Sequence, residues 1–540
     1  MIKKKKVSSV AYFCMEYGLD PSWKTYAGGL GILAGDYLKG AKDYQYPVIG
    51  IGIKWKQGYG DQMIGKNDYP FDAYHINQFK SLEDTKITVK VKIRNRDVAC
   101  KVWKTEQFGT VPLYLLDTDL AENEDQWITG QLYGWFSEER VAQEMVLGIG
   151  GVRALRQLGE DISVYHFNEG HAVFAGLELI RERIEQGLDF KQAWAASKEE
   201  IVFTTHTPVV QGNEEHTLER LMYMGVNNEL TPEQLVKIGG APFNMTVAAL
   251  RLSRNANAVA ALHGETAHKM WSHVEERAPI ISITNAIHLP TWVDEAILQA
   301  VEAENDEQLW ESHRQNKLEL INFIKEKNAV ELDPEVLLIG FARRAVGYKR
   351  SDLIFSDEEV IKSLLKDKKL QLVFSGKSHP LDDQGKEIIA RLVKFSRVYP
   401  ESVVFLENYD MTIAKNMTRG ADVWLNNPRR PLEASGTSGM KAAMNGVLNF
   451  SILDGWWPEV CEHGVNGWQF GNGFESDDPK VQDKHDLKAL YQVIQREIIP
   501  AYYNQRPQWI KMMRQSVLAT KEKFSMKRML DEYFQKLYRK

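Results

Sequence analysis

The sequence has few features of extracellular or membrane-bound proteins. It contains only three cysteines, Cys14, Cys100 and Cys461, which lie far apart and form no CxxC pair. This spacing argues against a disulfide framework or a structural zinc site and fits a reducing cytoplasm. No apolar run is long enough to cross a membrane, and the basic run at 3–6 lacks the apolar segment of a signal peptide. We therefore predict a cytoplasmic protein with no membrane partner.

Excess basic charge, repeats and low-complexity segments are also absent. The formal net charge is -6, so nothing in the composition indicates a nucleic-acid partner. The 540 residues exceed what a single hydrophobic core usually supports. Two or more domains are therefore expected.

Strand-like and helix-like segments alternate in the second half of the chain. This alternation predicts an α/β fold with a parallel sheet covered by helices on both faces, whose ligands bind beyond the carboxyl ends of the strands. The strand-like runs lie at 336–341, 370–375, 403–406, 421–425 and 447–452, and the helix-like segments at 358–366, 385–396 and 412–418.

The first half has a similar pattern with one insertion. The alternating stretch ITVKVKI and the run that follows it predict a β-hairpin near 87–106. The charged segment 289–327 reads as a helical bridge, and 508–540 as a helix with one apolar face. That helix is expected to close the globule, with a membrane-surface helix as the alternative. The apolar runs that lead into polar loops lie at 48–53, 163–167, 201–205 and 280–284.

Two segments have the composition of anion sites. The glycine-rich run at 27–31 precedes a helical stretch, so it reads equally as a structural turn or as amides that approach an anion. The basic segment 343–350 directly follows the predicted strand VLLIGF. Its position beyond a core strand favours an anion site over a solvated surface cluster.

Histidines follow two other predicted strands, in the stretches HFNEGH at 166–171 and THTP at 205–208. The spacing is not HExxH and no cysteine lies near, so we predict no metal site. Hydrogen bonding of a sugar by these histidines and Glu169 is the favoured interpretation. Structural capping of the loops is the alternative.

The stretch EASGTSGMK ends in a single lysine, Lys441. Its hydroxyl and glycine residues stand at a predicted helix start, where a phosphate can bind. A partly desolvated lysine near other cations has a lowered pKa and can react with an aldehyde. The residues alone therefore indicate a phosphate-binding loop with an unusual lysine, and an ordinary helix-surface lysine stays open.

This stretch closely resembles the pyridoxal-phosphate attachment motif of the α-glucan (glycogen/maltodextrin) phosphorylases, Glu-Ala-Ser-Gly-Thr-Gly-Asn-Met-Lys. Further matches occur in the family's order and cover nearly the whole chain. They are Glu16 in AYFCMEYG, Gly28-Gly29-Leu30-Gly31, Asn168-Glu169-Gly170-His171, Thr205-His206-Thr207, Asn257, Thr284-Asn285, the basic loop 343–350 and Glu407-Asn408-Tyr409.

The resemblance implies two Rossmann-like lobes of the GT-B glycosyltransferase type, with the active site in the cleft between them. The expected ranges are an N-terminal lobe at 1–286, a C-terminal lobe at 287–505 and a helical tail at 506–540. The implied reaction converts an α-1,4-glucan (glycogen or maltodextrin) and inorganic phosphate into α-D-glucose 1-phosphate, with retention. The implied cofactor is pyridoxal 5′-phosphate, whose own phosphate exchanges a proton with the substrate phosphate.

The resemblance also assigns roles to residues. Lys441 tethers the cofactor, and Arg344, Lys349 and His206 complete the catalytic set, His206 through its backbone carbonyl. Cofactor contacts fall to Lys441, Arg343, Gly29, Tyr409, Gly436 and Thr437. Substrate contacts fall to Glu16, Gly28, Leu30, Glu169, His171, His206, Asn257, Arg344, Lys349, Glu433, Ala434, Ser435 and Gly436.

Some positions depart from the family pattern. Arg343 replaces a lysine, Val346 a histidine, Ala27 an asparagine and Glu169 an aspartate, and 129–136 lacks the family's Asp-Asn gate loop. Little sequence precedes Glu16. In this respect the chain resembles a short bacterial or archaeal form of the family, for which allosteric control is not expected. A homodimer is expected because family members are commonly dimers.

Three other classes of protein fit the sequence less well. A nucleotide-sugar glucosyltransferase such as a glycogen synthase has the motif E-x7-E at this place, and its second glutamate accepts a hydrogen bond from the nucleotide ribose. Here the residue in that second position is Lys441, with seven residues between it and Glu433, so the ribose acceptor is lost. A non-catalytic glucan-binding protein would need no stacked phosphate sites. A pyridoxal enzyme acting on amino acids would need a pyridinium partner and a carboxylate clamp, and neither motif is present.

Overall fold

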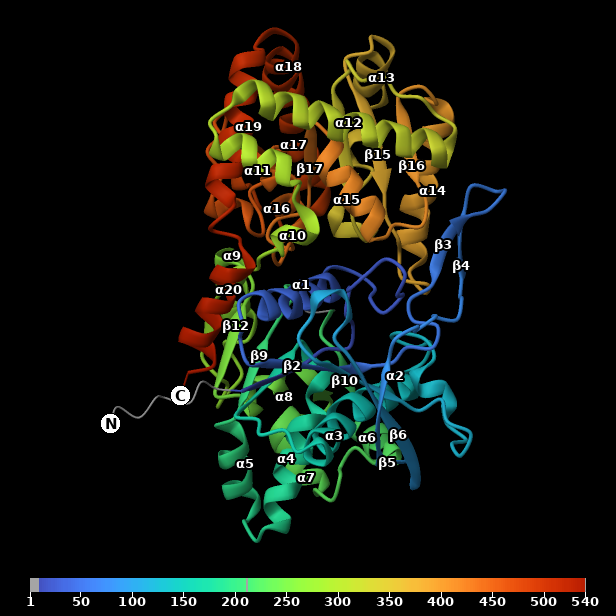
Figure 1. Cartoon of the computed structure of the whole chain (residues 1–540), viewed down its shortest axis with the longest axis vertical. Helices are drawn as coiled ribbons and strands as arrows, with labels where there is room; N and C mark the ends of the chain where they lie inside the picture. The colour runs from blue at the N-terminus through green and yellow to red at the C-terminus, as the bar shows by residue number, and fades with distance from the viewer. Residues whose placement is uncertain (1–8, 210–211, 540) are drawn as a thin grey trace. The chain divides into compact units, whose positions relative to one another are not determined.

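The computed structural model describes residues 9–209 and 212–539, so the basic run at 3–6 lies outside the described residues. Two compact units divide the chain. Unit 1 takes the described residues of Met1–Gly60, Tyr74–Thr284 and Met526–Lys540, and unit 2 takes Asp61–Ala73 and Asn285–Ser525. Each unit contains a sheet flanked by helices (Figure 1).

The observed division differs from the expected ranges in two places. Asp61–Ala73 belongs to unit 2, and the expected tail 506–540 is shared, since Met526–Lys540 packs in unit 1. The chain enters unit 2 at Asp61, returns to unit 1 at Tyr74 and enters unit 2 again after Thr284, close to the expected boundary between 286 and 287. As functional domains, the expected ranges stay a prediction.

Unit 2 is built on a six-stranded parallel sheet in the order β16-β15-β14-β17-β18-β19. This is a doubly wound order, with a switch point between β14 and β17 where the chain reverses its direction across the sheet. The α/β prediction for the second half is confirmed, and β19 is an additional strand. The strands are β14 (Leu338–Ala342), β15 (Gln371–Ser375), β16 (Val403–Leu406), β17 (Val423–Asn426), β18 (Leu448–Ile452) and β19 (Gly467–Phe470).

Alternate residues of these strands pack on opposite faces of the sheet, as the strand pleat requires. Leu338 and Ala342 join a core cluster with α12 and α15, whereas Ile339 and Phe341 join another with α13 and α14. The helices of unit 2 are α10 (Leu289–Trp292), α11 (Glu295–Glu302), α12 (Asp306–Asn328), α13 (Glu358–Lys366), α14 (Asp383–Val398), α15 (Met411–Gly420), α16 (Thr437–Met444), α17 (Pro479–Val493), α18 (Ile499–Asn504) and α19 (Arg506–Thr520).

Unit 1 contains a nine-stranded sheet in the order β13-β12-β9-β8-β1-β2-β7-β6-β5. The pairs from β13 to β7 are parallel, and β5 and β6 form the predicted antiparallel hairpin. A switch point lies between β1 and β8. The strands are β1 (Val10–Phe13), β2 (Val48–Ile53), β5 (Glu83–Ile93), β6 (Arg96–Thr105), β7 (Leu113–Asp117), β8 (Val164–Asn168), β9 (Ile201–Thr204), β12 (Asn255–Ala258) and β13 (Ile280–Ser282), with β10 (Glu215–His216) and β11 (Phe243–Asn244) paired apart from them.

The two faces of this sheet have different cores. Phe13 of β1 packs into a large apolar cluster, whereas its neighbour Tyr12 stacks on Tyr37 of α1. The helices of unit 1 are α1 (Gly29–Asp43), α2 (Ser137–Met145), α3 (Gly151–Leu158), α4 (Phe174–Glu185), α5 (Phe190–Lys198), α6 (Leu218–Met224), α7 (Pro232–Gly239), α8 (Met245–Leu252), α9 (Ala261–Met270) and α20 (Met526–Glu532).

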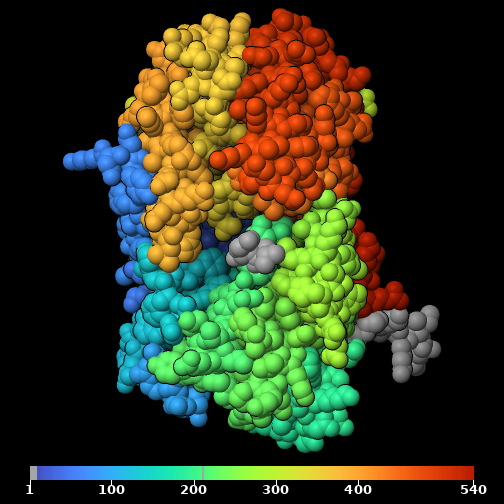
Figure 2. Space-filling model, turned by 180° about the vertical axis from the view of Figure 1, so that it is seen from behind, coloured from blue at the N-terminus to red at the C-terminus, as the bar shows by residue number. Residues whose placement is uncertain are grey.

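A hairpin from the first half of the chain packs within unit 2. It consists of β3 (Asp61–Ile64) and β4 (Pro70–Ala73). The Gln62 amide is the anchor, because its oxygen accepts from Ser378 N at 2.9 Å and its nitrogen donates to Asp72 at 2.8 Å. Figure 2 shows the tip of the hairpin (blue) standing out from the surface beside residues coloured orange, which include α14.

The C-terminal segment confirms the prediction of a packed closing helix. Met526, Leu530, Tyr533 and Leu537 of the predicted apolar face are buried in unit 1. Of the helices formed by residues 9–209 and 212–539, none has the length and apolar character to cross a bilayer.

Candidate functional site

In unit 2, the polar groups gather at the switch point of the sheet. Arg343 directly follows β14, and Asn426 ends β17, the neighbouring strand. The Arg343 guanidinium donates to the Asn426 amide oxygen and, at 2.6 Å, to Glu433. The prediction that the basic segment follows a core strand is confirmed. The carboxyl end of β14 is also the position in the sheet where folds of this kind bind ligands.

Lys349 joins the same buried cluster. Its ammonium lies 3.3 Å from Glu433, and Arg343, Lys349 and Glu433 are each less than a tenth exposed. Burial, followed by the charge of Arg343, lowers the pKa of Lys349 to about 7. Burial would raise the pKa of Glu433, but Arg343 and Lys349 hold it below its ordinary value. Two buried cations facing one carboxylate leave an excess of positive charge, which suits an anion.

Lys441 is buried within α16, the helix that the sequence indicated. It is 5% exposed, and its Nζ lies 3.4 Å from the centroid of the Trp292 ring. A cation–π contact of this kind stabilises a buried ammonium group. The surface-helix alternative for Lys441 is therefore excluded.

The loop before α16 fits a bound phosphate. Gly436 is the N-cap of the helix with a φ of 88°, a left-handed conformation that glycine adopts without strain. The Ser435 hydroxyl and Arg343 Nε are buried and have no hydrogen-bond partner in the described part of the chain. Buried polar atoms without partners beside a helix N-terminus are groups that a ligand can satisfy.

The other predicted residues of unit 2 have different environments. Arg344 is exposed, whereas Arg350 is buried and pairs with Asp483 and Asp486, so its role is structural. Tyr409 is half-buried, and burial raises the pKa of its hydroxyl. Ala434 and Thr437 are also half-buried, in the loop and first turn before Lys441.

In unit 1, Glu16 ties the glycine-rich run to the end of β1. The Glu16 carboxylate accepts from Ala27 N at 2.6 Å and Gly28 N at 3.1 Å, and the Tyr133 hydroxyl donates to its other oxygen. A Cβ on Gly31 would lie 2.6 Å from the same carboxylate, so this position requires glycine. The run 27–31 thus contains a structural turn and backbone amides that bind a carboxylate. Gly28 is the N-cap of α1, and Gly29 and Leu30 are its first two residues.

A second group lies at the ends of β8 and β9. The His206 ring nitrogen lies 2.7 Å from the Asn168 amide oxygen, and His206 N donates to Glu169 at 2.8 Å. Glu169 has a φ of 72°, which is uncommon for a residue with a side chain. Burial raises the pKa of Glu169 to about 7 and lowers that of His206 to about 3, so the imidazole is neutral near pH 7.

Two residues of the histidine and asparagine motifs are part of the core. His166 is fully buried between the Tyr538 hydroxyl and Thr204, each at 2.7 Å, so the interpretation of His166 as a sugar ligand is wrong. Asn257 is also fully buried, with its amide oxygen 2.6 Å from Thr204 Oγ1. His171 is half-buried with its ring 5.6 Å from Tyr133, and its role stays a prediction.

The sequence interpretation missed several residues of these groups. Asn426 ends β17 and Asp454 follows β18, and Glu433 N donates to Asp454 at 2.9 Å. Both could have been identified from the sequence, because each is a polar residue at or just beyond the end of a strand. The same pattern identified Arg343. Trp292 and Tyr133 carry no such signal, since only folding brings them to Lys441 and Glu16.

The fold and these groups define an α/β protein with an anion site at a sheet switch point and a buried lysine beside it. Residues 267–492 match the carbohydrate phosphorylase family. The chain is 38% identical to a maltodextrin phosphorylase of Thermococcus litoralis, over 98% of this chain and 70% of that protein. It is 36% identical to a glycogen phosphorylase of Aquifex aeolicus, over 98% and 86%, and 36% identical to an uncharacterised Methanocaldococcus jannaschii protein, over 98% and 99%. The chain therefore belongs to the carbohydrate phosphorylase family.

Proposed function

We propose that this chain is an α-glucan phosphorylase that transfers the terminal α-1,4-linked glucose of glycogen or maltodextrin to inorganic phosphate, releasing α-D-glucose 1-phosphate with retention. The buried Arg343–Lys349–Glu433 cluster at the switch point of unit 2 carries this proposal. The relatives named maltodextrin phosphorylase and glycogen phosphorylase support it. The family match also favours it over a nucleotide-sugar glucosyltransferase.

The cofactor would be pyridoxal 5′-phosphate, held in unit 2. The buried Lys441 would tether it, while Gly436, Thr437, Arg343 and Tyr409 would orient it. When bound, the cofactor supplies a phosphate that exchanges a proton with the substrate phosphate. The unsatisfied Ser435 hydroxyl and Arg343 Nε support this fit.

The substrate phosphate would be bound by Arg344 and Lys349. In the reaction, the bond between glucose C1 and the glycosidic oxygen breaks, and a phosphate oxygen bonds to C1. The departing glucan end takes up a proton. Lys349 would hold the phosphate dianion in its protonated form, and Glu433, which pairs with it at 3.3 Å, favours that form.

Unit 1 would bind the sugar. Asn168 and Glu169 fix His206 from its ring and its backbone N–H, so the His206 carbonyl is positioned to stabilise positive charge developing on glucose. Glu16, Gly28, Leu30, Glu169 and His171 would contribute sugar contacts in unit 1, and Glu433, Ala434, Ser435 and Gly436 in unit 2. The fully buried Asn257 would support this group from the core. The GT-B type of fold, a homodimer and a cytoplasmic location belong to the same proposal.

Lys441→Ala tests the proposal directly. The wild type, made in a pyridoxal-replete host, is expected to carry the cofactor's absorbance and to retain the cofactor on Lys441 after borohydride. Maltodextrin and phosphate should then yield glucose 1-phosphate. Lys441→Ala should lose the absorbance and at least 1,000-fold of the activity, or about 4 kcal/mol.

The matched control is Lys394→Ala, which removes an exposed lysine of α14. It should leave both absorbance and activity unchanged. A Lys441→Ala protein with full phosphorolysis would overturn the proposal, as would a wild type without cofactor.

A further inference from the structure

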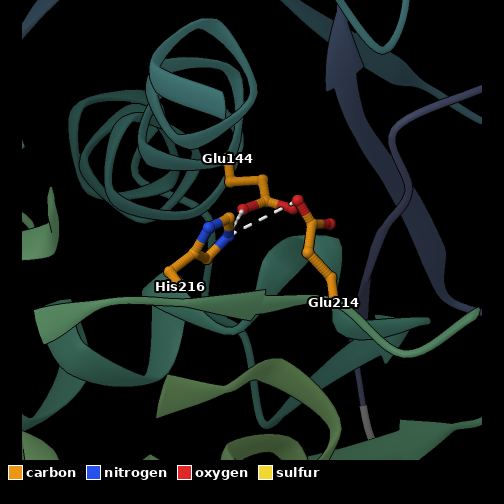
Figure 3. A group of neighbouring side chains, drawn as sticks. All are labelled: Glu144, Glu214 and His216. Atoms are coloured by element: carbon orange, nitrogen blue, oxygen red, sulfur yellow. Dashed lines mark ion pairs between the residues drawn. The ribbon is translucent and has the colours of Figure 1, made fainter. Parts of the chain in front are cut away.

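A cluster of three side chains in unit 1 lies outside the proposed sugar contacts. Glu144 is on α2, His216 is on β10, and Glu214 directly precedes β10. One ligand atom from each lies within 4.8 Å of the others. Figure 3 shows the two carboxylates and the imidazole turned toward a common point. We call this set the Glu144–Glu214–His216 cluster.

The separations in the cluster suit a metal better than hydrogen bonds. His216 Nε2 lies 3.4 Å from Glu144 Oε2 and 3.4 Å from Glu214 Oε1. Charge-assisted N–H···O bonds are shorter, about 2.7–2.9 Å. In a tetrahedral zinc site with bonds of about 2.0–2.2 Å, neighbouring ligand atoms lie about 3.4 Å apart.

Two of the three side chains are buried without hydrogen bonds. The Glu144 side chain is fully buried, and His216 is 3% exposed. Neither oxygen of Glu144 and neither ring nitrogen of His216 has a hydrogen-bond partner among residues 9–209 and 212–539. Since buried polar groups are normally satisfied, Glu144 Oε2 and His216 Nε2, which lie 3.4 Å apart at the common point, indicate a missing ligand.

The cluster has more acidic than basic groups when both carboxylates are ionised. Arg140 is the neighbouring cation: its Nε lies 3.2 Å from Glu144 Oε1 and donates to Glu214 at 3.0 Å. With a neutral imidazole, two carboxylates and one guanidinium leave one buried negative charge. A divalent cation at the common point supplies the missing charge. Arg140 would then orient Glu214 by hydrogen bonding, as residues that contact metal ligands commonly do.

We propose that Glu144, Glu214 and His216 bind one divalent transition-metal ion, with zinc as the best match. One imidazole nitrogen and two carboxylate oxygens are ligands that zinc accepts, with a fourth position for water. Magnesium and calcium prefer all-oxygen sites with more ligands. The ion would join α2 to β10, ten residues beyond His206, and would stabilise unit 1 without acting on the substrate.

The experiment uses the full chain, stripped with a chelator and then titrated with Zn²⁺ and Co²⁺. We expect one tightly bound zinc per chain, the visible spectrum of tetrahedral cobalt, and a higher melting temperature with zinc. Glu144→Gln and His216→Asn should weaken zinc binding at least tenfold and remove the cobalt spectrum. Glu214→Gln, which changes a partly exposed side chain, should do the same even if the buried variants fail to fold.

The control is His463→Asn in the exposed His463–Glu497 pair, which brings together one imidazole and one carboxylate at 2.7 Å. This variant should bind zinc as the wild type does. A wild type that binds no stoichiometric zinc overturns the proposal and leaves a proton on His216 as the balancing charge. Equal binding by the wild type and the Glu214→Gln variant also overturns it, because the metal would then be adventitious.

Discussion

Lys349 shows how burial sets the chemistry of a single residue. Its ammonium is buried beside Arg343, and both effects disfavour the charge, which lowers the pKa to about 7. The carboxylate of Glu433 opposes them. Lys349 therefore loses its proton as the pH rises through about 7, within the range where the proposed reaction would run.

Sulfate provides a test of this residue, because it keeps one charge state across the range where phosphate titrates. We expect sulfate to inhibit the wild type about tenfold more weakly at pH 8.5 than at pH 6, a difference of about 1.4 kcal/mol. Inhibition constants measured from pH 6 to 8.5 check this. Lys349→Arg keeps its charge and should abolish most of the pH dependence. A wild type with a flat profile would contradict the lowered pKa.

At the scale of elements, the side chain of Gln62 is the buried anchor of the hairpin of β3 and β4. Gln62 is 3% exposed, and its amide bonds both to Ser378 N and to Asp72 of the hairpin. Asn408 adds hydrogen bonds to the backbone of Gln62 from the loop after β16. Glu407 and Asn408, which matched the family motif, thus support this hairpin in the structure.

Gln62→Ala should therefore loosen the hairpin. It leaves the buried Ser378 N–H without an acceptor, which costs about 1–3 kcal/mol. Hydrogen exchange should become faster in β3 and β4 while α16 keeps its protection. Asn67→Ala, at an exposed position near the tip, is the control and should change little. Unchanged exchange in Gln62→Ala would show that the anchor lies elsewhere.

At the scale of the whole molecule, each unit has its own core. Phe13 is fully buried in the apolar cluster of unit 1, and Phe450 is fully buried in a cluster of unit 2. The chain leaves one unit for the other after each of the residues Gly60, Ala73, Thr284 and Ser525. A substitution in the core of one unit is therefore expected to lower the stability of that unit and to leave the other unit's stability unchanged.

Phe13→Ala and Phe450→Ala form a matched pair. Each removes a buried ring and should destabilise its own unit by about 3–5 kcal/mol. Hydrogen exchange should rise in unit 1 for Phe13→Ala and in unit 2 for Phe450→Ala. A uniform increase across both units from either variant would show that the units unfold as one.

The sequence determined the local elements and the most specific motif. The strands of unit 2 were predictable because buried parallel strands are short apolar runs between helices, and polar residues such as Arg343 directly follow them. Lys441 was identified because its motif is contiguous in the sequence. Family membership could be predicted for the same reason, and the comparisons confirm it.

Only the tertiary structure decided which residues meet. Trp292 lies against Lys441, the Gln62 hairpin packs in unit 2, and His166 is a core residue, although its motif suggested a sugar ligand. The Glu144–Glu214–His216 cluster likewise joins a helix and a strand that share no motif. Periodicity and spacing report neighbours along the chain, whereas burial and charge depend on contacts between distant segments, and those exist only once the chain has folded.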